Sequence, residues 1–302
     1  MTLIITKNSI YYDYNDNFDF FKTSPKDSFH ENKMLSQQST TPLHIACSKN
    51  DYPLIKSQIN LFKQFFDFKD IDENYPIFCL FKNENISQKF CLQILKILFF
   101  HNYNINQTNK FNQNIIHQCC LYETPEIVEF LCKQNANVNH RDIYNKTPLH
   151  YACEYGFFNN AIVLIVNNAL VHINECNIQP IHLLSLSKES SVEKLIEFTK
   201  LLLDNGADVN SIHSIFGYTP LHSACIKNNI LLIYFLHENG ANPNIKQISG
   251  NTPLHLCSNL DIIKLLIKYN ADPNIENNLN RKPIDIAITK KNQDIIDFYK
   301  QL

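Results

Sequence analysis

A seven-residue phrase recurs along this chain at a nearly constant interval. It reads TPLHIAC at residues 41–47, TPLHYAC at residues 147–153 and TPLHSAC at residues 219–225, and a shorter copy, TPLHLC, occupies residues 252–257. Weaker copies begin at residues 75, 114, 179 and 282, so successive starts are separated by 34, 39, 33, 32, 40, 33 and 30 residues. A unit of this length exposes apolar faces to its neighbours and cannot stand alone, so we expect a stack of similar units.

A second phrase repeats in phase with the first. It reads NGADVN at residues 205–210 and NGANPN at residues 239–244, with shorter copies at residues 135–139 and 270–274. Two phrases with a common period near 33 residues are typical of ankyrin repeats, which the chain resembles from residue 39 to its end. The resemblance implies an all-α solenoid of about eight helix-turn-helix repeats, joined by turn fingers that resemble β-hairpins. The repeats would start near residues 41, 75, 114, 147, 179, 219, 252 and 282.

The residues of one repeat agree with this expectation. Thr147 is placed to cap a helix, and Pro148 stands at the first helical position, where its missing N–H costs nothing. An apolar second helix follows and should end near Asn168, where a left-handed residue suits a helix end. The same place in other repeats is held by Asn135, Gly206, Gly240 and Asn270. In the turns, Asn145, Gly217 and Gly250 are placed to take a positive φ.

Three intervals depart from the period. The steps of 39 and 40 residues contain polar insertions, at residues 82–89 and 185–191, which should lengthen the loop between two helices. The step of 30 residues lacks residues after Cys257. We expect the last unit, residues 282–302, to be a solvent-facing cap, because its second helix is polar.

Residues 1–38 show no such pattern. An aromatic and acidic stretch at residues 11–21 has no clear helical period. We expect this N-terminal extension to be disordered, and we assign residues 39–302 to the repeat domain. A structured cap and packing onto the first repeat are the alternatives for the extension.

Composition narrows the classes of partner. The 27 basic and 29 acidic residues give a net charge of −2, which does not favour nucleic acid or an anionic membrane. The apolar runs are far shorter than the roughly 20 residues that span a bilayer, so no membrane insertion is expected. We also expect no signal peptide, because only three consecutive apolar residues stand near the start. Ten cysteines in such a chain indicate free thiols in a reducing compartment, the cytoplasm or the nucleus.

Regularly spaced histidines can indicate metal ligands, and the repeated phrase contains six of them. They are His44, His117, His150, His182, His222 and His255. Neighbouring helices stack about 8–10 Å apart, whereas zinc lies about 2 Å from each ligand nitrogen, so these side chains cannot share an ion. The resemblance implies instead that each histidine bonds to nearby backbone and to the threonine of its own phrase. The cysteines of the phrase are interpreted as small, buried packing residues.

Catalytic patterns are missing from the sequence. It contains no phosphate-binding glycine loop, no His-Glu-x-x-His and no Gly-x-Ser-x-Gly. We therefore expect no enzyme activity, no cofactor and no bound metal.

A partner site can be mapped by the resemblance, which implies binding through the turn fingers and the exposed ends of the inner helices along a concave groove. The predicted partner-binding residues are Lys110, Phe111, Tyr122, Ile143, Tyr144, Lys146, Glu154, Tyr155, Ile215, Phe216, Tyr218 and Lys227. The mapping also includes Leu121 and Ile226. The fifth repeat contributes Cys176 and Ile178, which are neither aromatic nor charged. The aromatic members would form a stripe, and tyrosine is enriched in binding hot spots. Packing between neighbouring fingers is the alternative role for these rings.

These observations predict a monomeric, non-catalytic, intracellular protein–protein interaction module. The alternative is a substrate adaptor or effector that recruits other machinery through residues 1–38. A regulatory fragment of an enzyme or channel is disfavoured, because the sequence shows no second domain or membrane span.

Overall fold

The computed structural model describes residues 4–6, 9–11, 40–82, 87–172, 178–185, 191–213 and 216–302. The chain divides into two units, residues 1–39 and 40–302. In the first unit, strands β1 (Ile4–Thr6) and β2 (Ser9–Tyr11) pair in antiparallel orientation. The predicted disorder of the extension otherwise concerns positions outside the described residues.

The second unit is built from pairs of short helices. The first member of each pair, the inner element, is α2 (Pro42–Ser48), the 3-10 helix η2 (Pro76–Phe81), α5 (Ile115–Cys119), α7 (Pro148–Tyr155), α9 (Pro180–Ser185), α11 (Pro220–Ile226), α13 (Pro253–Leu256) and α15 (Pro283–Thr289). The second, outer members are α3 (Tyr52–Phe62), which runs into the 3-10 helix η1 (Lys63–Phe65), α4 (Gln88–Phe100), α6 (Pro125–Lys133), α8 (Phe158–Val166), α10 (Val192–Asp204), α12 (Ile230–Glu238), α14 (Leu260–Lys268) and α16 (Gln293–Tyr299). The eight predicted helix pairs are therefore present in the described residues.

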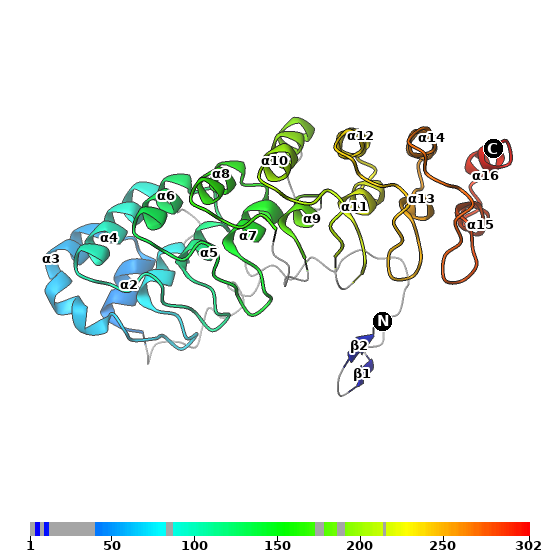
Figure 1. The fold of residues 1–302 in the computed structure, drawn as a ribbon. Coiled ribbons are helices and arrows are strands. Elements are labelled where there is room, and N and C mark those ends of the chain that lie inside the picture. Colours follow the sequence, from blue (N-terminus) through cyan, green and yellow to red (C-terminus); the bar gives the residue numbers. More distant parts are fainter. Residues whose placement is uncertain are drawn as a thin grey trace. The chain divides into compact units, whose positions relative to one another are not determined.

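The pairs stack in two rows (Figure 1). Each inner element contacts the inner element of the next pair, from α2 and η2 to α13 and α15. The outer helices from α3 to α12 likewise contact one another in order. Turn segments project from the inner row as fingers. The predicted all-α repeat solenoid is confirmed.

Threonine and histidine of the phrase start the inner helices. The backbone N–H of Thr147 donates to Nδ1 of His150 over 3.1 Å, and the Thr147 hydroxyl lies 2.8 Å from the same nitrogen. Equivalent capping pairs occur at α2, α11 and α13. The phrase therefore recurs because it satisfies N–H groups that a helix N-terminus leaves unpaired.

Two pairs differ from the others in ways that follow from their sequence. Tyr75 replaces the capping threonine of the second repeat and makes no side-chain cap bond, and the inner element there is a 3-10 helix. In the seventh repeat, the missing residues shorten α13 to four residues, and Cys257 leaves it in an extended conformation. The insertions fall largely on residues 83–86 and 186–190, which are outside the described residues.

The left-handed positions are as predicted. Asn135, Asn168, Asn270, Gly206 and Gly240 follow the outer helices with φ values between 59° and 90°. Their N–H groups bond back to the last helical turn, as that of Asn168 does to the carbonyl of Ile165 over 3.0 Å.

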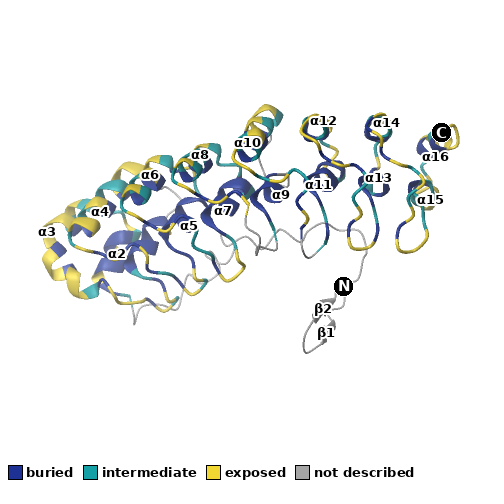
Figure 2. Cartoon of the chain, viewed as in Figure 1, coloured by how far each residue is buried: buried dark blue, intermediate teal, exposed yellow. Residues whose placement is uncertain are grey.

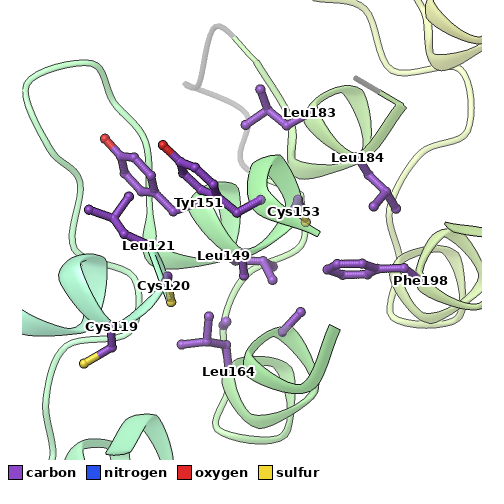
Figure 3. Packing of buried hydrophobic residues seen from close by; sticks show 14 of the residues in the cluster. Cys119, Cys120, Leu121, Leu149, Tyr151, Cys153, Leu164, Leu183, Leu184 and Phe198 are labelled. Carbon is purple, nitrogen blue, oxygen red and sulfur yellow. The ribbon is translucent and has the colours of Figure 1, made fainter. Parts of the chain in front are cut away.

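One continuous core runs through the stack. Figure 3 shows Leu149, Tyr151 and Cys153 of α7 between Cys119 and Cys120 on one side and Leu183 and Leu184 of α9 on the other. Figure 2 shows burial concentrated in the inner row and exposure on the outer helices and finger tips. The predicted packing role of the cysteines is confirmed, since Cys47, Cys119, Cys153, Cys225 and Cys257 are all buried.

Candidate functional site

In several fingers, a polar side chain at the start of the finger accepts hydrogen bonds from backbone N–H groups of the same finger. In the fourth repeat, Asp142 N–H donates to the carbonyl of Lys146 over 3.0 Å. The Asp142 carboxylate accepts from the N–H groups of Tyr144 and Lys146, each over 2.9 Å. Asn109 and Asn277 bind their own fingers in the same way. A short polar side chain therefore fixes these three fingers. The predicted positive φ is present at Asn145, Gly217 and Gly250.

Neighbouring fingers are bonded to each other. Ile143 N–H donates to the carbonyl of Phe111 in the preceding finger over 3.0 Å, and Ile248 N–H donates to Phe216 over 3.2 Å. At Gly250, with φ of +79°, an added Cβ would lie 2.6 Å from the backbone nitrogen of Asn278. The fingers thus form a connected row in which glycine permits close backbone approach.

The structure places the predicted residues in three environments. Lys110, Ile143, Tyr144 and Lys227 are exposed, and Phe111, Tyr122, Lys146, Glu154, Phe216 and Tyr218 are half-buried. Tyr155 is buried, Leu121 is buried, and Ile178 and Ile226 are half-buried. Ile215 and Cys176 lie outside the described residues.

Tyr155 requires a correction, because an exposed anchor was expected at this position. Its side chain is only 9% exposed, and its ring stacks on Phe157 with the ring centres 6.0 Å apart. The residue is the last of the buried residues of α7, next to the left-handed Gly156 that ends the helix. Tyr155 is therefore mainly a packing residue.

Other rings also contact one another. Tyr122 stacks on Phe81 with ring centres 6.0 Å apart, and its hydroxyl donates to the carbonyl of that residue. Phe216 stacks on Tyr218 at 5.9 Å. Tyr122 thus joins neighbouring repeats and Phe216 contacts a ring two residues away, whereas Tyr144 is 60% exposed.

The charged pair of the predicted site is internal to one repeat. Lys146 Nζ lies 2.7 Å from a carboxylate oxygen of Glu154, and both side chains are about four-fifths buried. The same ammonium lies 5.3 Å from the ring centre of Tyr151, whose hydroxyl donates to Asp142 over 2.6 Å. Gln113 of the preceding finger donates to that hydroxyl over 2.9 Å. This network links the finger to α7 and to the repeat before it.

Sequence reasoning missed several apolar finger tips. Ile71, Ile248 and Leu279 are exposed at positions that correspond to Ile143 or Tyr144 in other fingers. The predicted site lies between residues 110 and 227 and does not include them. The signal that could have found these residues is an aliphatic residue one or two positions after the side chain that closes each finger.

The histidines of the phrase are fully engaged by hydrogen bonds. His150 Nδ1 accepts from Thr147, as described above, and Nε2 lies 2.8 Å from the carbonyl oxygen of Ile178. A carbonyl can only accept, so Nε2 carries the proton and the ring is neutral. The other five bond to a carbonyl of the next repeat over 2.9–3.2 Å: His44 to Asn74, His117 to Lys146, His182 to Ser211, His222 to Asn251 and His255 to Arg281.

Burial reinforces this neutral state. It lowers the pKa of His117, His150, His182 and His222 to about 4, because a charged imidazole loses its hydration there. Within the described residues, no three histidine, cysteine, aspartate or glutamate side chains are grouped so as to hold a metal ion. The arrangement serves helix capping and repeat stacking.

The family is shown by sequence comparison. The family model described as "Ankyrin repeats (3 copies)" matches residues 84–177, 188–277 and 231–298, which together cover more than half of the chain. The chain therefore belongs to the ankyrin-repeat family. Ankyrin repeats are generally protein–protein interaction modules and are typically non-catalytic.

Individual relatives match parts of the chain. A segment of 108 residues is 40% identical to ankyrin repeat protein FPV031 of Fowlpox virus, covering 33% of this chain and 32% of the viral protein. A segment of 103 residues is 31% identical to the B-cell lymphoma 3 protein homolog of Mus musculus, covering 33% of this chain and 23% of that protein. The chain spans about a third or less of the length of these curated relatives.

Solved structures share the fold over most of the chain. The ankyrin repeat domain of Bcl-3 aligns with a TM-score of 0.58 and 22% identity, covering 86% of this chain and 98% of that one. The human ASB11 ankyrin repeat domain aligns with a TM-score of 0.60 and 21% identity, covering 85% and 96%. None of the described helices combines the length and apolarity needed to cross a membrane.

Proposed function

We propose that this chain is a non-catalytic module that binds a protein partner along its fingers and the adjoining ends of the inner helices. The observation that carries the proposal is the tip of the fourth finger. Tyr144 is 60% exposed, although its backbone is bonded to Asp142 and its finger is bonded to Phe111. A large apolar side chain on a fixed backbone loses little further freedom on binding, which favours affinity.

The proposed surface extends along the row of fingers. It comprises the exposed residues Lys110, Ile143, Tyr144, Lys227, Ile71, Ile248 and Leu279, with the half-buried rings of Phe111, Tyr122, Phe216 and Tyr218 beside them. Spaced apolar tips separated by polar backbone suit an extended partner segment that contacts several fingers. Binding energy in such interfaces is concentrated in a few buried anchors, and Tyr144 is the first candidate.

Lys146 and Glu154 would contribute in a different way. Their charges already neutralise each other, so neither attracts a charged partner group strongly. We expect this pair to support the shape of the fourth finger and to affect binding through that shape.

Partner capture tests the proposal. The full chain, an Ile143→Ala/Tyr144→Ala variant and a Val166→Ser control would be used to retain proteins from cell extract, with quantification by mass spectrometry. Val166 is 75% exposed at the end of outer helix α8 and therefore controls for loss of any exposed apolar side chain. Proteins retained by the wild type and the control, and lost with the finger variant, are the expected result. Equal retention by all three chains would reject the finger surface.

We further propose that the module acts as a monomer inside the cell, in the cytoplasm or the nucleus. The cysteines of the described ranges are free, and burial raises the pKa of the thiols of Cys79 and Cys91 to about 12. Such thiols pack as apolar groups and suit a reducing compartment.

A further inference from the structure

The outer helices of the first two repeats carry an unusual charge distribution. Residues 52–66 and 87–103, which include α3, η1 and α4, contain Lys56, Lys63, Lys89 and Lys96 and no aspartate or glutamate. By contrast, α6, α10, α12 and α16 each contain more carboxylates than lysines. Asp51 and Asp67 flank the first stretch, and Asp51 accepts a hydrogen bond from the N–H of Leu54 and caps α3. The two stretches themselves therefore supply positive charge and no negative charge.

The same face exposes large apolar side chains. Phe100 is 80% exposed at the end of α4, and Phe90 is exposed near its start. Positions 90, 93, 97 and 100 follow the helical period, so Phe90, Gln93, Ile97 and Phe100 share one side of α4. Figure 2 shows exposed residues over both α3 and α4.

A hollow lies between these two helices. Its volume is about 300 Å³, and it is lined by Tyr52, Gln93, Lys96, Ile97 and Phe100. Lys56 Nζ lies 5.8 Å from the ring centre of Tyr52, at the margin of the hollow. An apolar floor with two ammonium groups beside it would accept a large apolar side chain whose neighbours in sequence are acidic.

We propose that this α3–α4 surface, defined by Tyr52, Lys56, Gln93, Lys96, Ile97 and Phe100, binds an acidic protein segment that carries aromatic or large aliphatic side chains. The surface belongs to the outer row, so this is a second binding site that goes beyond the finger surface. Lysines on helices that contain no carboxylate favour an anionic partner, and long-range attraction would speed encounter. Burial of the exposed Phe100 ring would add apolar contact energy.

A protein segment fits this surface better than a phospholipid surface does. The hollow is shallow and open to solvent, and its volume of about 300 Å³ is at the lower end of small-molecule pockets, which run from about 300 to 1,000 Å³. A side chain of a flexible segment can enter such a hollow, whereas an amphipathic membrane contact relies on an apolar face that projects into the lipid.

Peptide selection tests the proposal. A library of random 12-residue peptides would be selected for binding to the full chain and depleted on a Lys96→Glu/Phe100→Ser variant, with the Ile143→Ala/Tyr144→Ala variant kept as a positive arm. Selected peptides, labelled with fluorescein, would then be titrated in anisotropy measurements. Circular dichroism would establish that each variant is folded, which is expected because both substituted side chains are exposed.

The expected peptides contain aspartate or glutamate interleaved with phenylalanine, tyrosine or leucine. The affinity of these peptides should fall about tenfold or more in a Lys56→Glu/Lys96→Glu variant, and it should also fall at higher salt. It should stay within about twofold of the wild-type value in the finger variant and in a Lys133→Glu/Val166→Ser control. Failure to select such peptides, or selection of basic or uncharged ones, would overturn the proposal. The proposal would also be overturned if the chain bound phosphatidylserine vesicles through Lys96 and Phe100 but bound no peptide. Loss of binding in the finger variant alone would assign the peptides to the other surface and also overturn it.

Discussion

The imidazole of His150 connects two repeats: its Nε2 donates to the carbonyl oxygen of Ile178, 2.8 Å away in the following unit. Its other nitrogen accepts from Thr147 at the start of its own helix. One side chain therefore couples helix capping to repeat stacking. Because the equivalent bonds occur at all six histidines of the phrase, stacking and local helix formation reinforce each other along the chain.

Replacing His150 with alanine should destabilise the repeat domain by about 2–3 kcal/mol, since it leaves a buried carbonyl and a buried N–H without their partner. Urea unfolding followed by circular dichroism measures this loss. The matched change His172→Ala alters an exposed histidine outside the phrase and should cost less than about 0.5 kcal/mol. Similar losses in the two variants would contradict the coupling role.

Stability should decrease on acidification between about pH 6.5 and pH 4. Burial lowers the pKa of His150 to about 4, whereas in the unfolded chain the pKa of histidine is near 6.5. The unfolded state therefore binds protons in this window before the folded state does, and stability that is fully present above pH 6.5 is lost as the pH falls. The limit for one such histidine is about 3 kcal/mol. Thermal melts at several pH values measure the slope.

A His150→Gln chain provides the control for this effect, because glutamine does not titrate. Carboxylates contribute equally to both chains, so the variant should be less stable at pH 7 but lose less on acidification. Parallel pH profiles for the two chains would show that this histidine does not contribute to the acid sensitivity.

Two glycines with similar backbone conformations should respond differently to alanine. Gly206 and Gly250 both have positive φ, which costs an alanine about 1–2 kcal/mol. A Cβ at Gly206 would meet nothing within 4 Å, whereas one at Gly250 would collide with the backbone of Asn278 in the next finger. Gly250→Ala should therefore be the more destabilising by at least about 1 kcal/mol in urea unfolding. Equal losses would indicate that the fingers separate easily.

Replacement of two tyrosines of the predicted site should change the free energy of unfolding by different amounts, because one ring is exposed and the other is buried. Tyr144→Ala should change the unfolding free energy by less than about 0.5 kcal/mol, because the ring is largely exposed. Tyr155→Ala should cost about 3 kcal/mol or more, because it removes a buried ring that stacks on Phe157. Urea titrations of both variants measure the difference, and a stable Tyr155→Ala chain would contradict the packing role.

Local patterns were sufficient to predict the helix starts, the finger turns and the left-handed residues. Thr147 bonds to His150 three positions away, and Asn168 takes a left-handed conformation just after its helix. The local conformation at each place therefore depends on residues within a few positions. Such short-range interactions depend only on residues that are close together in the sequence. The role of the phrase could be recognised for the same reason.

Exposure could not be predicted in this way. Tyr144 and Tyr155 were expected to act alike, yet one lies on a finger tip and the other is covered by its own repeat. The α3–α4 hollow also depends on two helices from different repeats.

The sequence by itself determined the number of repeats, the helical character of their elements and the capping role of the phrase. Only the tertiary structure decided which side chains remain accessible, which fingers bond to each other and which carbonyl each histidine reaches. The physical reason is distance along the chain: capping and turns join residues three or four apart, whereas the bond from His150 to Ile178 joins residues 28 apart. Contacts of that kind exist only after the repeats have stacked.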